Sequence, residues 1–109
     1  PPRSTLFPYT TLFRSGIFVE LVYVSCPLEI DAKQLSIAAT KGTIISLEDH
    51  TVHGGLSSII ADKLVELGLS PKLVKMGVRN YAMSGAVDDV YRWAGLDTAS
   101  IIKTIKANL

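Results

Sequence analysis

Short apolar runs alternate along this chain with stretches of helical spacing, and this alternation is what most limits the possible folds. The runs are FVELVYV at residues 18–24, TIISL at 43–47 and LVKMGV at 73–78. Strands that are apolar on both faces are typical of a parallel sheet buried between helices. The sequence therefore predicts a three-layer α/β domain, in which right-handed crossovers join a parallel sheet to helices on both of its faces.

The predicted helices have recognisable starts and ends. Asp31 is placed to cap a helix over residues 32–40, and Gly68 is placed to end the next helix in the left-handed conformation. Asp97 or Thr98 is expected to cap a last helix that carries three isoleucines. Three strands make a small sheet, and the first of them has no helix before it. We therefore expect the domain to lack its first strand–helix unit.

Residues 1–15 do not share this pattern. From Thr5 to Ser15 they match, codon by codon, the translation of a common sequencing-library adapter. We therefore expect residues 1–15 to be a non-native, disordered segment and residues 16–109 to be the incomplete domain. Without the two arginines of that segment, the domain carries 9 basic and 10 acidic side chains, a net charge of −1. Since phosphate contacts need clustered Lys and Arg, no nucleic-acid partner is expected.

The apolar runs are too short to cross a bilayer, and the single thiol, Cys26, cannot pair within the chain. We therefore expect no membrane partner, no disulfide framework and a cytoplasmic location. Cys26 precedes Pro27 and has no positioned base near it in the sequence, so we interpret it as a buried small residue rather than a nucleophile. Arg79 could bind a carboxylate or phosphate, but isolated arginines are usually surface ion-pair partners.

The densest group of polar residues follows the second apolar run, at residues 48–58 (EDHTVHGGLSS). In open α/β sheets, ligands usually bind at the carboxyl ends of the strands. Gly54 and Gly55 at a helix start could bind an anion through exposed amides, although the spacing lacks a dinucleotide or phosphate-loop fingerprint. We therefore favour a structural role, in which the two glycines permit a tight turn and close packing of helix on strand. The hydroxyl of Ser57 or Ser58 would accept hydrogen bonds from the free N–H groups of the first helical turn.

Four of these residues, Glu48, Asp49, His50 and His53, could also be drawn as ligands of zinc or of a non-haem metal ion. All four lie on one predicted loop, whereas a closed site usually takes ligands from more than one element. We therefore interpret them as polar residues at a packing surface, and we expect this chain to hold no catalytic, cofactor-binding or metal-binding residue. We predict that six residues form an interface or loop motif: Glu48, Asp49, His50, Gly54, Gly55 and Ser58.

Three stretches of the chain resemble the C-terminal domain of transketolase-like, thiamine-diphosphate-dependent enzymes. The first is Ile44–His50 followed by Gly54-Gly55-Leu56 and Ser58, and the second is Lys75–Arg79 followed by Tyr81–Gly85. The third runs from Tyr91 through Leu96-Asp97 to Ile105. These stretches carry the resemblance, which as a whole runs from Val19 to the end of the chain. One departure is Ser57, where the family usually has glycine.

The resemblance implies a parent enzyme of the pentose phosphate pathway that transfers two-carbon ketol units between sugar phosphates. Thiamine diphosphate and Mg would lie between two other domains of that parent, whereas this domain would contribute packing and dimer contacts. The implied partners are the remaining domains or subunit of the parent, itself a homodimer. The C-terminal domain of deoxyxylulose-phosphate synthase is one alternative, and a free-standing anion-binding or interaction module is another.

Overall fold

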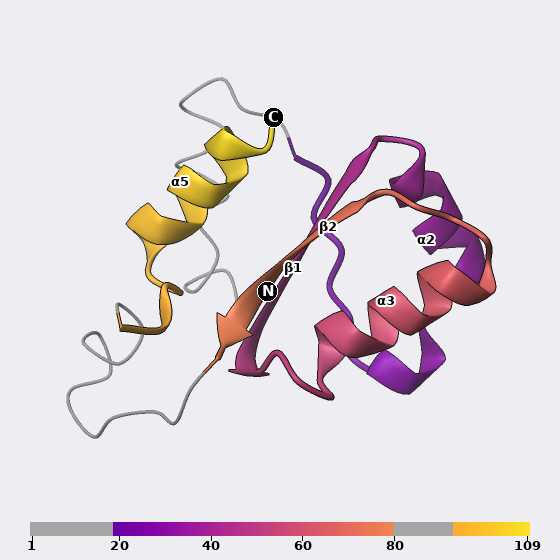
Figure 1. Ribbon diagram of the computed structural model, residues 1–109, viewed down its shortest axis with the longest axis horizontal. Helices are drawn as coiled ribbons and strands as arrows, with labels where there is room; N and C mark the ends of the chain where they lie inside the picture. The colour runs from indigo at the N-terminus through magenta and orange to yellow at the C-terminus, as the bar shows by residue number, and fades with distance from the viewer. Residues whose placement is uncertain (1–18, 80–92) are drawn as a thin grey trace. The chain divides into compact units, whose positions relative to one another are not determined.

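The computed structural model describes residues 19–79 and 93–109 (Figure 1). The chain divides into two compact units, Val24–Met83 and a second that joins Pro1–Tyr23 to Ser84–Leu109, and each is described by itself. In chain order, the first unit contains η2 (Pro27–Glu29), α2 (Ala32–Ala39), β1 (Thr43–Thr51), α3 (Leu56–Glu66) and β2 (Lys72–Val78). The described part of the second unit contains α5 (Thr98–Ala107).

β1 and β2 pair in parallel, which confirms the predicted parallel sheet. The register sets Leu47 opposite Met76 and Thr51 opposite Val78, so three residues of β1 lie opposite one residue of β2 between these pairs. Such a bulge bends a strand and changes the direction of its side chains. The expectation that this strand ends at Leu47 was wrong, because residues 48–50 continue it through the bulge.

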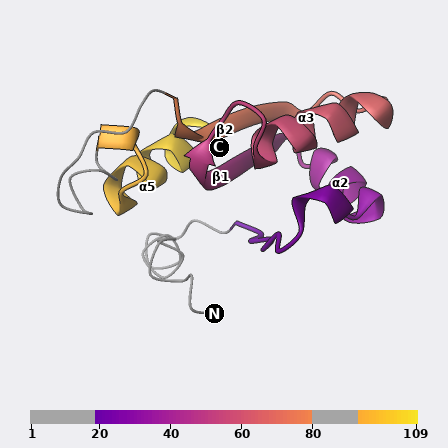
Figure 2. The ribbon, with the colours of Figure 1, turned by 90° about the horizontal axis from the view of Figure 1, so that it is seen from below.

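α2 and α3 cover one face of this sheet (Figure 2). Leu35 of α2 forms a buried cluster with Ile60 and Leu64 of α3. Ile44 and Leu73 lie opposite each other in the two strands and pack against this cluster. Burying one such aliphatic side chain stabilises a fold by about 1.5–3 kcal/mol. The cluster therefore holds α3, and with it the loop that precedes α3, against β1.

The predicted helix ends are confirmed at three places. The Asp31 carboxylate accepts a hydrogen bond of 2.9 Å from the backbone N–H of Lys33 and so caps α2. Gly68, just after α3, has a φ of 70°, which is the left-handed conformation expected of it. Asp97 caps α5, where it accepts bonds from the backbone N–H of Ser100 (3.3 Å) and from the hydroxyl of Ser100 (2.6 Å).

Three predictions about the first third of the chain and about α3 were wrong. Residues 19–24 form no strand, and the side chains of Leu21, Val22 and Tyr23 are 50%, 40% and 58% exposed. A strand needs a neighbour that satisfies its backbone groups, and composition alone does not supply one. Cys26, expected to be buried, is exposed. The helical spacing of Leu56, Ile60 and Leu64 predicts that Leu67 continues their apolar face. Leu67 is instead exposed, because α3 ends at Glu66.

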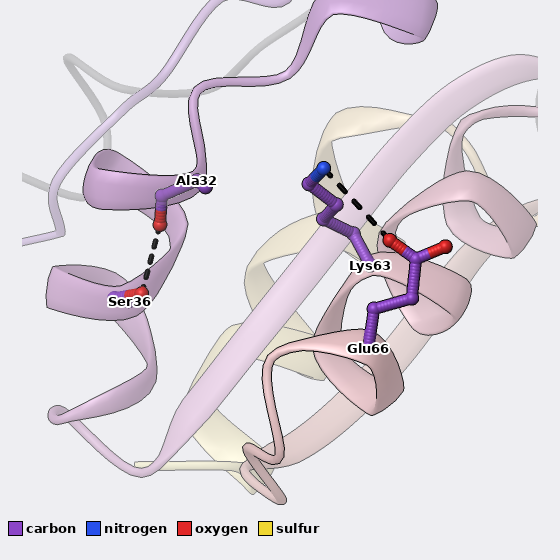
Figure 3. A network of polar contacts seen from close by, with 4 residues as sticks. All are labelled: Ala32, Ser36, Lys63 and Glu66. Carbon is purple, nitrogen blue, oxygen red and sulfur yellow. Dashed lines mark hydrogen bonds and ion pairs between the residues drawn. The ribbon is translucent and has the colours of Figure 1, made fainter.

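Polar contacts on the helices of the first unit are local (Figure 3). The Ser36 hydroxyl donates to the Ala32 carbonyl, one turn back in α2, at 2.8 Å. Lys63 and Glu66 of α3 form an ion pair at 3.9 Å. Because the two side chains are 38% and 70% exposed, this pair contributes at most about 1 kcal/mol.

Other predictions concern residues outside the described ranges. They include the Tyr81–Gly85 stretch of the resemblance. The sequence also predicts a helix over residues 87–94, and most of that range lies outside the described residues. Within residues 19–79 and 93–109, no helix is long and apolar enough to cross a membrane.

Candidate functional site

The start of α3, which lies in the predicted loop motif, is capped by the carboxylate of Glu48. One oxygen of Glu48 accepts a hydrogen bond of 2.8 Å from the backbone N–H of Leu56, and the other accepts one of 3.0 Å from Ser57. These N–H groups belong to the first turn of α3, where a helix has no acceptor of its own. A carboxylate is also favoured there by the helix dipole. Glu48 therefore ties the bulge of β1 to the start of α3.

Gly55 leaves the space that this carboxylate occupies. A Cβ atom at Gly55 would collide with an oxygen of Glu48 and would lie 2.7 Å from the carbonyl oxygen of Thr51. Gly54 has a different role, because its φ of 85° is in the left-handed region and open space surrounds its Cα. The two glycines thus serve close packing and a tight turn, as predicted.

The two serines of this loop do not serve the free amides of α3, so that part of the prediction was wrong. The hydroxyls of Ser57 and Ser58 each lie 3.1 Å from the carbonyl of Val52, to which they donate. The Ser58 hydroxyl also accepts a hydrogen bond of 2.9 Å from the N–H of Gly54. Ser57 and Val52 are buried, so these bonds hold the loop inside the unit.

The remaining polar residues of the motif do not join this arrangement in the described structure. Asp49 is exposed, and only the backbone of His50 is described. His53 is exposed, and its N–H donates to the Thr51 hydroxyl at 3.2 Å. Among the described side chains, no three of His, Cys, Asp and Glu lie together in a way that could hold a metal ion. The exposed Arg79 donates to the Lys75 carbonyl at 2.7 Å.

A buried hydroxyl lies two residues before Glu48 in the same strand. Ser46 is 3% exposed, and its hydroxyl has no hydrogen-bond partner in the described structure. Leaving a hydroxyl unsatisfied in an apolar environment costs free energy.

A shallow hollow of about 300 Å³ lies between the end of α2 and the segment that enters β2. Two of the hydroxyls that line it are already committed as donors, since Ser36 donates to Ala32 and Thr40 donates to the Ile37 carbonyl at 2.6 Å. No carboxylate, imidazole or thiol lines the hollow. Its polar side chains are hydroxyls alone, with no base beside them in the lining, which is Ser36, Ala39, Thr40, Gly42, Leu69, Ser70 and Pro71.

Sequence reasoning missed the capping role of Glu48, because the carboxylate and the amides it binds are eight and nine residues apart. A signal was available in the residue before α3. Gly55 occupies the capping position and has no side chain that could accept a hydrogen bond. A helix start without a local acceptor needs one from elsewhere, and Glu48 and Asp49 are the nearest carboxylates that precede it in the sequence.

Comparison with known proteins gives a consistent result. Residues 9–101 match the family model described as the transketolase C-terminal domain. The chain is similar to a transketolase C-terminal section of Methanocaldococcus jannaschii, with 33% identity over 95 residues. It is also similar to 1-deoxy-D-xylulose-5-phosphate synthase of Chlorobium phaeovibrioides (28% over 97 residues) and to one subunit of the apulose-4-phosphate transketolase of Actinobacillus succinogenes (30% over 95 residues).

These matches cover most of this chain but a small part of each relative. They take in 86%, 87% and 84% of the chain, against 29%, 15% and 30% of the three relatives. Among solved structures, a split-gene transketolase, described as an inactive β4 tetramer, superimposes with a TM-score of 0.75 and 25% identity. That match covers 91% of this chain and 32% of the other. It bears out the expected fold class.

Proposed function

Since this chain belongs to the transketolase C-terminal domain family, we propose that it is the non-catalytic C-terminal domain of a larger transketolase-like enzyme. The parent would transfer two-carbon ketol units between sugar phosphates in the pentose phosphate pathway, using thiamine diphosphate and Mg held by its other domains. This domain would supply packing and subunit contacts. The relatives support such a division, because each of them extends far beyond the part that this chain matches.

The observation that carries the proposal is the carboxylate of Glu48 at the start of α3. In a parallel α/β sheet, this position, at the carboxyl end of a strand and the amino end of a helix, is where a phosphate usually binds. Here two amides that could bind a phosphate are hydrogen-bonded to Glu48. A negative ligand would have to displace a negative side chain. The arrangement therefore supports a structural role and counts against the free-standing anion-binding module.

Titration calorimetry with thiamine diphosphate and Mg²⁺ tests the non-catalytic part of the proposal. We expect no saturable heat, because the amides at the start of α3 are already bound to Glu48. Saturable, Mg²⁺-dependent binding would contradict the proposal. The Glu48→Ala variant is the control for sensitivity, since it frees the amides of Leu56 and Ser57.

A deoxyxylulose-phosphate synthase is the second candidate parent, because a relative of that activity matches 87% of the chain. Chimeras separate the two candidates. Residues 19–109 would replace the matched section of the Methanocaldococcus jannaschii relative in one chimera and that of the Chlorobium phaeovibrioides synthase in the other. We expect correct assembly in the first chimera and impaired assembly in the second, measured by sedimentation. The reverse result would favour the synthase.

The proposed partners are the remaining domains or subunit of the parent, which we propose to be a homodimer. The split-gene transketolase supports self-association, since it is described as a β4 tetramer. We also propose a cytoplasmic location for the parent. An exposed, unpaired thiol at Cys26 is compatible with a reducing compartment.

A further inference from the structure

We draw no further inference here: the strongest candidate, the exposed apolar side chains of Leu28, Ile37 and Val65 on η2, α2 and α3 of the first unit, carries none, because nothing in the structure shows what covers them.

Discussion

Glu48 is the residue on which the account of this domain depends most. Its two oxygens accept hydrogen bonds from two consecutive amides of α3, at 2.8 and 3.0 Å. A hydrogen bond to a charged group contributes about 1.5–3 kcal/mol, and removing the acceptor leaves both amides unsatisfied. The side chain thus links a strand and a helix that the chain connects only through a glycine turn.

We expect Glu48→Ala to lower the free energy of unfolding by about 1.5–3 kcal/mol. Glu48→Gln keeps one acceptor oxygen and should lose about half as much. Urea denaturation measures both. Asp49→Ala is the matched control, because Asp49 is the exposed neighbour, and its effect should stay within about 0.5 kcal/mol. Equal effects of Glu48→Ala and Asp49→Ala would show that the cap contributes no stability.

Gly55 and Gly54 should respond differently to an added methyl group. Gly55→Ala places its Cβ against Glu48, whereas Gly54→Ala places one in open space and costs about 1–2 kcal/mol through its left-handed backbone. In double-mutant cycles with Glu48→Ala, Gly55→Ala should show a coupling energy of about 0.5–3 kcal/mol. Gly54→Ala should be close to additive. Additivity at Gly55 would contradict the contact.

At Ser46, unlike at Glu48 and Gly55, we expect a substitution to leave stability unchanged or to raise it. Its buried hydroxyl has no partner in the described structure, so Ser46→Ala removes an unsatisfied group from the interior. We expect the variant to be as stable as the unmodified chain or more stable, by up to about 1 kcal/mol, in thermal unfolding. A loss of more than about 1 kcal/mol would mean that the hydroxyl has a partner, such as a buried water.

At the scale of the elements, α3 is fixed by its inner face. Leu64 is 5% exposed and belongs to the cluster with Leu35 and Ile60, whereas the next residue, Val65, is 78% exposed. Leu64→Ala should therefore destabilise the domain by about 2–5 kcal/mol, and Val65→Ala by less than about 0.5 kcal/mol. Chemical denaturation of the two variants side by side checks this. Similar losses of stability in the two variants would contradict the orientation of α3 in which Leu64 faces the core and Val65 faces away from it.

Elements whose ends depend on local chemistry could be predicted from the sequence. Asp31, Gly68 and Asp97 act through neighbours a few residues away. Asp31 and Gly68 were placed correctly, and Asp97 was one of the two caps expected for the last helix. The strand expected over residues 18–24 was not found over residues 19–24, because a strand depends on a partner that is often distant in the chain. The Glu48 cap was missed for the same reason: the bulge in β1 brings the carboxylate to the helix, and nothing in the composition of residues 48–50 specifies a bulge.

At the scale of the whole molecule, the fold class and the family were accessible from the sequence, and the function of the parent was not. The alternation of strands and helices predicts the parallel sheet, and the three motif stretches lie within or beside the range that matches the family. The chain, however, spans 29% of its Methanocaldococcus jannaschii relative and 15% of its Chlorobium phaeovibrioides relative. The substrate and cofactor chemistry that we propose for the parent therefore depends on residues outside the matched part.

The most direct test of the central claim follows the amides of Leu56 and Ser57 by NMR while inorganic phosphate, and then thiamine diphosphate with Mg²⁺, is added to the full chain. If Glu48 fills the start of α3, neither signal should shift with saturation in the unmodified chain. In Glu48→Ala, phosphate should shift both signals, because their N–H groups become available. Saturable shifts of these two amides in the unmodified chain would contradict the account, since they would make the helix start a ligand site.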